Sequence, residues 1–368
     1  MTIGIPKEIK PQENRVGAIP SSVERFTAAG HTVMVERGAG EGSGFSDRDY
    51  ELAGARIFET AKEIYAGADM IYKVKEPLAP EYPLLREGQI IFAYLHLAPD
   101  LPQIKALTDS KVSAVAFETV QLDNGSLPLL TPMSEVAGKM SVQIGASLLQ
   151  KANGGSGILL GGVPGVAPGH IVIIGAGVVG LEAARIAIGL GARVTVVDIS
   201  VERLKYIGTV LPGAETLISN KSNIASVVKQ ADLLIGAVLV AGAKAPVLVT
   251  EEMVKSVRPG SVIVDVAIDQ GGIAETIDRV TSHQDPFYIK HGVLHYSVPN
   301  IPGAVPRTST FALSNATIPY ALKIANQGLE NALRDDPALF KGLNTYKGKI
   351  ACQAVAEAQG LPYEQVVF

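Results

Sequence analysis

Residues 170–200 read HIVIIGAGVVGLEAARIAIGLGARVTVVDIS, and this stretch decides the fold of the central part of the chain. A β-branched run leads into a glycine-rich turn, an alanine-rich helical segment follows, and a second β-branched run ends at Asp198. Gly175, Gly177 and Gly180 have the spacing of a dinucleotide-binding turn between a strand and a helix. We expect the first glycine to permit the tight turn, the second to let a pyrophosphate approach the backbone, and the third to let the helix pack closely.

The acidic residue that ends the second run predicts which dinucleotide binds. Asp198 follows the glycines by about 20 residues, where a carboxylate accepts hydrogen bonds from the adenosine ribose hydroxyls and repels a 2′-phosphate. The N-terminus of the intervening helix offers free N–H groups and a positive dipole to the phosphates. We therefore predict NAD, rather than NADP, as the cofactor. The alternative is a glycine turn that binds nothing.

Composition narrows the class of protein. The chain has 368 residues, of which 47% are apolar and 18% charged, and its mean hydropathy is +0.25, so we expect roughly two domains with sizeable cores. The net charge of −4 and the lack of basic runs or zinc-type spacing argue against nucleic acid and metal as partners. The apolar runs near 171–181 and 233–243 are too short and glycine-rich to span a membrane. With one cysteine, Cys352, and no signal-peptide pattern at the N-terminus, we predict a cytoplasmic protein.

Short strand-like runs alternate with amphipathic segments along the chain, which is typical of an α/β fold with a mostly parallel sheet. In the first part, we expect strands at residues 2–6, 31–36, 55–59, 69–75, 89–97 and 111–120, and helices at 21–30, 47–54 and 100–110. In the second part, we expect strands at residues 170–177, 193–200, 232–240 and 261–269. The Asn-Gly pair in LDNGSL, residues 122–127, predicts a hairpin.

Two long helices mark where the chain passes between domains. One begins with Thr131 as a cap and Pro132 in the first turn, and the other follows the proline-rich turn near 302–306. We therefore predict two Rossmann-like, doubly wound domains. The NAD-binding domain, residues 130–306, is inserted into a first domain made of residues 1–129 and 307–368.

Three side chains in the first domain could serve a small anionic substrate. His96 lies near the end of the apolar run QIIFAYLHL, residues 89–97, where the alternative is a satisfied structural histidine. Arg15 follows the first strand and Lys75 ends another. All three would lie at the carboxyl edge of the sheet, where ligands bind. From the residues alone, Arg15 would be interpreted as a solvated loop charge and Lys75 as a surface lysine.

The chain resembles the L-alanine dehydrogenase family in motifs spread over both predicted domains. These motifs are GIPKEIKPQENRV (4–16), YKVKEP (72–77), YLHLA (94–98), TPMSEVAG (131–138), LLGGVPGVAP (159–168), DLLIGAVLV (232–240), DVAIDQGG (265–272), PNIPGAVPRTSTFALSNAT (299–317) and KGLNT (341–345). The resemblance implies reversible oxidative deamination of L-alanine to pyruvate and ammonium with NAD, by a homohexamer. It also implies that residues 1–129 and 307–368 form the substrate and catalytic domain, with the site in the cleft between the two domains.

The resemblance further implies roles for individual residues. His96 would be the general acid/base, and Asp269 would assist in handling water and ammonia. Asp265 lies inside the strand pattern, where a structural role is expected. The substrate would contact Arg15, Lys75, Met133 and Asn300. The cofactor would contact Ser134, Gly175, Gly177, Val178, Val179, Gly180, Asp198, Arg203, Leu239, Val240, Ala267, Ile268, Asp269, Arg279, Val298 and Ile301.

Two departures from the family pattern leave the shape of the nicotinamide pocket open. Ile273-Ala274 stands where relatives usually have Cys-Phe, and Pro299-Asn300-Ile301-Pro302 stands where they usually have Ala-Asn-Met-Pro. The main alternative function is the NAD(H)-binding subunit of a proton-pumping transhydrogenase, whose members lack the combination of KVKEP and YLHLA. A dehydrogenase of the saccharopine or lysine type is a second alternative.

Overall fold

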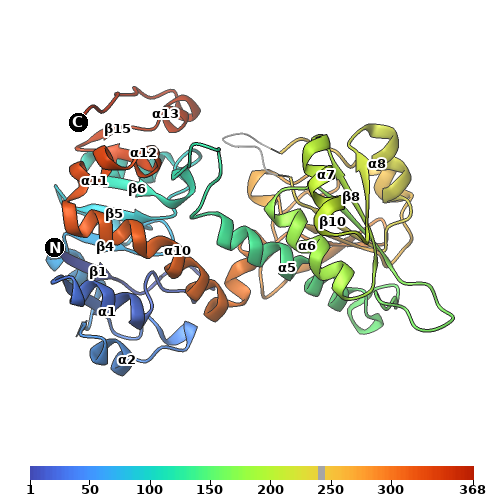
Figure 1. Cartoon of the computed structure of the whole chain (residues 1–368), viewed down its shortest axis with the longest axis horizontal. Coiled ribbons are helices and arrows are strands. Elements are labelled where there is room, and N and C mark those ends of the chain that lie inside the picture. The colour runs from blue at the N-terminus through green and yellow to red at the C-terminus, as the bar shows by residue number, and fades with distance from the viewer. Residues whose placement is uncertain (239–244) are drawn as a thin grey trace. The chain divides into compact units, whose positions relative to one another are not determined.

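The computed structural model describes residues 1–238 and 245–368, which form two compact units. Unit 1 consists of Met1–Met133 and Val305–Phe368, so it is discontinuous in sequence. Unit 2 consists of Ser134–Ala304. Each unit is a sheet with helices packed on it (Figure 1), which confirms the predicted α/β fold class.

Unit 2 contains a seven-stranded sheet in the order β12-β13-β11-β10-β7-β8-β9. Its strands are β7 (His170–Ile174), β8 (Arg193–Asp198), β9 (Ala214–Ile218), β10 (Leu233–Gly236), β11 (Val262–Asp265), β12 (Phe287–Lys290) and β13 (Val293–Tyr296). All neighbours are parallel except β12 and β13. Read from β9 to β13, the order is that of a doubly wound dinucleotide-binding sheet, with β7 and β10 at the switch point.

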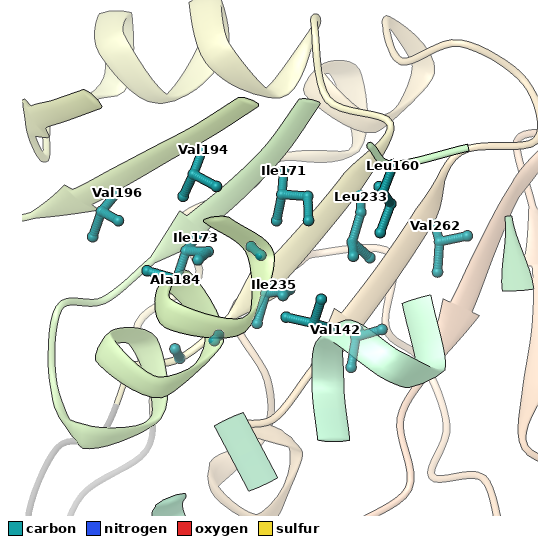
Figure 2. Close-up of a cluster of buried hydrophobic side chains, with 14 of the residues drawn as sticks. Val142, Leu160, Ile171, Ile173, Ala184, Val194, Val196, Leu233, Ile235 and Val262 are labelled. Carbon is teal, nitrogen blue, oxygen red and sulfur yellow. The ribbon is translucent and has the colours of Figure 1, made fainter. Parts of the chain in front are cut away.

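The strands β7, β10, β11 and β13 of unit 2 are buried along their whole length, which explains their continuous apolar sequences. Its helices are α5 (Thr131–Leu148), which begins in unit 1, α6 (Val178–Gly189), α7 (Val201–Val210), α8 (Lys221–Val228) and α9 (Glu251–Lys255), with short 3₁₀ turns at η4 (Lys151–Asn153), η5 (Ile268–Gln270) and η6 (Ile301–Ala304). Figure 2 shows Ile171 and Ile173 of β7 packed with Ala184 of α6 and Val142 of α5. The alternate residues of β7 belong to a second core with α8 and α9.

Unit 1 contains an eight-stranded sheet in the order β15-β14-β6-β5-β4-β1-β2-β3. Its strands are β1 (Thr2–Ile5), β2 (Thr32–Glu36), β3 (Arg56–Phe58), β4 (Met70–Tyr72), β5 (Ile90–Ala93), β6 (Ser113–Ala116), β14 (Leu343–Tyr346) and β15 (Lys349–Ile350). The six strands from β3 to β6 are parallel and repeat the doubly wound order, whereas β14 and β15 pair antiparallel. The switch point of this sheet lies between β1 and β4.

Helices cover both faces of the sheet in unit 1. They are α1 (Pro20–Ala28), α2 (Asp47–Leu52), α3 (Ala61–Gly67), α4 (Leu101–Asp109), α10 (Pro306–Gln327), α11 (Leu329–Asp335), α12 (Pro337–Lys341) and α13 (Gln353–Gln359), with 3₁₀ turns at η1 (Glu41–Ser43), η2 (Tyr82–Leu84) and η3 (Phe117–Thr119). One core joins α3, α4 and α13 to the sheet. On the other face, Tyr72 of β4 packs edge-on against Phe26 of α1 and hydrogen-bonds Thr317 of α10.

The structure corrects three details of the sequence prediction. The strand expected at 89–97 ends at Ala93, and the one expected at 69–75 ends at Tyr72. The strand expected at 89–97 ends early because the N–H groups of Leu95 and His96 donate to a side-chain carboxylate instead of to a neighbouring strand. The hairpin expected at 122–127 is wrong, since these residues form a turn with no flanking strands.

Candidate active site and dinucleotide site

Loops after three neighbouring strands of unit 1, together with the first turn of α5, bring together four of the predicted site residues. Arg15 follows β1, Lys75 follows β4 and His96 follows β5, and these parallel strands end at the same edge of the sheet. Met133 joins them from the first turn of α5, with its Sδ atom 3.1 Å from Arg15 Nη1. The loops after β1 and β4 flank the switch point, which is where ligands bind in such sheets.

Arg15 is buried rather than solvated, because Glu13 neutralises it. Its Nε and Nη2 atoms lie 2.7 and 2.5 Å from the two carboxylate oxygens of Glu13, and Arg15 is only 2% exposed. Burial alone would raise the pKa of Glu13, but the bidentate ion pair with Arg15 lowers it to about 2. The pair is therefore fully charged at neutral pH, and Nη1 is the guanidinium atom on the side of Met133.

Lys75 is half-buried and held from its backbone. The N–H groups of Val74 and Lys75 donate to Glu8 Oε1 at 2.6 and 3.2 Å. Burial, followed by the positive charge of Arg15, lowers the pKa of Lys75. Burial likewise raises the pKa of Glu8 to about 7. The positive charges of Arg15 and Lys75 lie close enough to affect each other, and such a pair of charges favours the binding of an anion.

His96 is exposed and lies beyond the strand, not within it. Its imidazole stacks on the ring of Tyr94, with centroids 6.0 Å apart and an interplanar angle of 7°. Its Nε2 atom lies 3.5 Å from the ammonium of Lys75. The backbone at His96 is left-handed, with φ of 50°. The imidazole is therefore accessible and adjacent to the cationic cluster, which does not suit a satisfied core histidine.

The glycine turn of unit 2 joins β7 to α6. Gly175 has a φ of 112°, and a Cβ there would lie 2.4 Å from the carbonyl oxygen of Ala237. A Cβ on Gly180 would lie 1.8 Å from the carbonyl oxygen of Gly175. By contrast, within residues 1–238 and 245–368 a Cβ on Gly177 would meet only Arg203 Nη1, at 3.7 Å. Protein contacts therefore require the first and third glycines, whereas Gly177 leaves space beside the start of α6.

That start of α6 is suited to a phosphate group. Gly177 is the N-cap and has no side chain with which to cap the helix, so the first N–H groups of α6 suit an anionic ligand. Asp198, at the end of β8, is buried and accepts hydrogen bonds from the N–H groups of Ala176 (2.6 Å) and Ser200 (2.7 Å). Each carboxylate oxygen retains a second lone pair for a ribose hydroxyl. Arg203 is exposed in α7 beside the glycine turn.

Asp269 lies in η5, on the loop that follows β11, and its side chain is exposed. Asp265, the last residue of β11, is buried and closes this loop: Oδ1 accepts from Ala267 N–H at 3.0 Å and Oδ2 from Ile273 N–H at 2.6 Å. Burial raises the pKa of Asp265 to about 6.

The other predicted cofactor and substrate residues are distributed over unit 2. Ala267, Ile268, Val298 and Ile301 are buried, and the last two belong to the core that includes α5 and α6. Ser134, Val179 and Asn300 are half-buried, while Val178 and Arg279 are exposed, with Arg279 stacked on the ring of Tyr288 at 4.4 Å. Leu239 and Val240 lie outside the described residues.

The described residues provide neither a group of metal ligands nor a helix that could cross a membrane. Within residues 1–238 and 245–368, no group of three or more histidine, cysteine or acidic residues is placed to hold a metal ion. Over the same ranges, no helix combines the length and apolar character needed to cross a membrane.

The sequence prediction missed three neighbours of the unit 1 cluster: Glu13, Tyr94 and Glu118. Glu13 and Tyr94 each lie two residues before a predicted site residue, so local spacing could have suggested them. Glu118 lies 22 residues from His96 in sequence and hydrogen-bonds its N–H. Only the pairing of β5 with β6 brings it close, so no local signal could have found it.

The chain has two doubly wound sheets. One carries a dinucleotide-type glycine turn, and the other carries a cationic cluster beside a histidine. These features are those of a two-domain α/β oxidoreductase. The families "Alanine dehydrogenase/PNT, N-terminal domain" and "Alanine dehydrogenase/PNT, C-terminal domain" match residues 4–137 and 141–353. The chain therefore belongs to the alanine dehydrogenase/PNT family, which confirms the predicted resemblance.

Individual relatives cover nearly the whole chain. An alanine dehydrogenase of Methanococcus maripaludis is 60% identical over 99% of this chain and 98% of its own length. Alanine dehydrogenase 2 of Staphylococcus aureus is 57% identical, over 100% and 98%. A solved L-alanine dehydrogenase superimposes with a TM-score of 0.95 at 53% identity, covering 98% of this chain and 99% of that one. A transhydrogenase from Sinorhizobium meliloti gives 0.82 at 27% identity, covering 95% and 100%.

Proposed function

We propose that this chain catalyses the reversible oxidative deamination of L-alanine to pyruvate and ammonium with NAD. The observation that carries the proposal is the cluster of Arg15, Lys75 and His96 at one edge of the unit 1 sheet, which provides two cations and a titratable imidazole for a small α-amino acid. The much higher identity to alanine dehydrogenases than to the transhydrogenase, 53–60% against 27%, favours this function over a nucleotide-holding subunit.

Unit 2 fits the proposed cofactor. The glycine N-cap of α6 and the space beside Gly177 support the binding of a pyrophosphate there, and the carboxylate at the end of β8, Asp198, is proposed to accept hydrogen bonds from a ribose and to repel a 2′-phosphate. Bound NAD supplies the hydride acceptor. We assign unit 2 as the NAD-binding domain and unit 1 as the substrate and catalytic domain.

In unit 1, Arg15 and Lys75 are proposed to bind the substrate carboxylate. Glu13 holds Nε and Nη2 of Arg15, and Nη1 lies beside Met133, another predicted substrate contact; we assign Nη1 to the substrate carboxylate. Lys75 adds a second charge. The ion pair with Glu13 also keeps the cluster from carrying two uncompensated charges before the substrate arrives.

His96 is proposed to move protons at the substrate. Oxidised alanine is an iminium, which must gain water at Cα and then lose ammonia. The imidazole would take a proton from the adding water and return one to the nitrogen as the C–N bond breaks. Asp269 is proposed to assist the water and the departing ammonia from unit 2, and Asn300 to contact the substrate.

The finer features rest on the family resemblance. We propose a homohexamer, which sedimentation velocity would test, and a cytoplasmic location, to which the single Cys352 adds support. The remaining cofactor contacts named from the resemblance are proposed on the same basis.

The function is tested by NADH formation against a panel of L-amino acids, with pyruvate plus ammonium in the reverse direction. We expect L-alanine to be the best substrate, and His96→Ala and Asp269→Asn each to lower kcat by roughly 10²- to 10⁴-fold while NADH still binds. His291→Ala is a matched control, because His291 is also exposed, has a φ of 53° and contacts the carboxylate of Glu251. A His96→Ala enzyme with wild-type turnover would contradict the proposed mechanism.

A further inference from the structure

The backbone that presents His96 is in a conformation that histidine adopts only at a cost. A φ of 50° lies in the left-handed region, which is uncommon for residues other than glycine and requires support from the surrounding structure. The turn also takes the N–H groups of Leu95 and His96 out of the sheet ladder. Such groups need acceptors elsewhere.

Glu118 supplies those acceptors. Its Oε1 atom lies 2.7 Å from the N–H nitrogen of His96 and 3.1 Å from that of Leu95, and its Oε2 atom lies 3.3 Å from Leu95 N. Glu118 belongs to η3, directly after β6, and β6 pairs with β5 up to Ala93 and Ala116. The carboxylate thus reaches from the end of one strand across to the turn that ends its neighbour. Hydrogen bonds to a carboxylate are stronger than those to a neutral acceptor.

Other contacts fix the imidazole but not the backbone that carries it. The ring of His96 stacks on Tyr94, whose hydroxyl donates to the carbonyl oxygen of Leu129 at 2.5 Å. Lys75 approaches the far nitrogen of the imidazole. These contacts restrict the ring only if the turn keeps its shape. Within the described residues, Glu118 is the side chain that accepts hydrogen bonds from the N–H groups of the turn at residues 95–96.

We propose that Glu118 is a positioning residue for His96: its carboxylate holds the left-handed turn at residues 95–96 and so fixes where the imidazole stands. This inference rests on the proposed role of His96 as the general acid/base. Glu118 acts through the backbone and needs no contact with the substrate. Its removal should therefore affect the rate of the proton-transfer steps and leave the binding of cofactor and substrate nearly unchanged.

Glu118→Gln is the first test, because glutamine keeps the volume but replaces one acceptor oxygen with an NH₂ donor. We expect kcat to fall roughly 10- to 100-fold, the range for a small misplacement of a catalytic group. The KM values for alanine and NAD should change less than about threefold if only the proton-transfer geometry is affected. Glu87→Gln is the matched control, since Glu87 is an exposed carboxylate of the same unit that pairs with Lys111. It should behave as wild type.

The same change in a His96→Ala background separates positioning from other roles. If Glu118 acts through His96, Glu118→Gln should cause no further loss of kcat there. An equal loss of kcat in the wild-type and His96→Ala backgrounds would overturn the proposal. So would a wild-type kcat for Glu118→Gln if His96→Ala has a strongly reduced kcat. Wild-type turnover of His96→Ala itself would instead refute the proposed function. If Glu118→Gln does not fold, Glu118→Asp is tested instead: its shorter carboxylate should reach fewer of the N–H groups and should lower kcat relative to wild type, and an unchanged kcat would refute the inference.

Discussion

Replacing Arg15 should affect stability and substrate binding through two separate causes. Arg15→Ala removes the partner of Glu13, a carboxylate whose side chain is 0% exposed. With Arg15 present, the pKa of Glu13 is about 2 instead of 4.5. That difference corresponds to about 3 kcal/mol of stability, which agrees with the cost of 3–5 kcal/mol for breaking a buried ion pair. This contribution is complete above pH 4.5 and is lost as the pH falls toward 2.

In Arg15→Ala the pH dependence should reverse. Burial, the largest influence on Glu13, now raises its pKa, so the folded protein binds a proton that the unfolded chain releases. The variant should therefore lose stability as the pH rises from about 5 to about 8. Urea unfolding followed by circular dichroism at both pH values measures this slope. Adding Glu13→Gln to the variant should restore most of the lost stability and flatten the slope.

The double variant also isolates the effect on substrate binding. Losing a charge-assisted hydrogen bond to the carboxylate costs about 1.5–3 kcal/mol, so the KM for alanine should rise roughly 10- to 150-fold. Binding of NADH should change little, because we propose that the cofactor binds to unit 2. A stable Arg15→Ala/Glu13→Gln enzyme with a normal KM for alanine would remove Arg15 from the substrate site. An Arg15→Ala variant as stable as wild type at about pH 8 would refute the ion-pair reasoning.

Three further predictions concern unit 2. Asp198→Asn keeps an acceptor for the glycine turn but removes the charge facing the ribose, so the ratio of kcat/KM for NAD over NADP should fall at least about tenfold; an unchanged ratio would show that Asp198 does not select the cofactor. Gly180→Ala should prevent folding or NADH binding, because its Cβ would lie 1.8 Å from a backbone oxygen. Gly208→Ala in helix α7, where a Cβ would meet none of the described residues within 4 Å, should instead stabilise by roughly 0.5–1 kcal/mol in thermal unfolding. Burial raises the pKa of Asp265 from 3.8 to about 6, so the stability of the wild type should fall by about 3 kcal/mol relative to that of Asp265→Asn as the pH rises from 3.8 to about 6. Above that range the two stability curves should run parallel. Curves that are parallel at every pH would contradict the raised pKa.

Hydrophobic patterning predicted most of the strands, because parallel strands buried on both faces have continuous apolar sequences. The strand ends were less predictable. The run 89–97 remains apolar through Leu95 and Leu97, yet the sheet ends at Ala93. The later residues are buried in loops rather than in the ladder, and composition does not distinguish these two kinds of burial. The Asn-Gly pair at 124–125 does form a turn, but strand-forming residues on both sides are needed for a hairpin.

The site was predictable where its residues follow strands of a recognised order. Arg15, Lys75 and His96 come together because β1, β4 and β5 are neighbours, and the alternation of strands and helices suggested that order. Burial of Arg15 by Glu13 and support of the His96 turn by Glu118 depend on side-chain directions and strand pairing. Neither is encoded in spacing alone, so these contacts required coordinates.

The discontinuity of unit 1 has a consequence for synthesis on the ribosome. The N-terminal half of its sheet depends on α10: the N–H groups of Val16 and Ile19 donate to the hydroxyls of Thr310 and Ser314. These partners emerge only after all of unit 2, about 170 residues later, which takes roughly 10–30 s at usual elongation rates. By the end of that interval unit 2 has its whole sequence available and can fold, whereas the nascent N-terminal part of unit 1 still lacks its partners in α10. From this order of synthesis we expect residues 1–133 to depend more on chaperones during translation than unit 2 does.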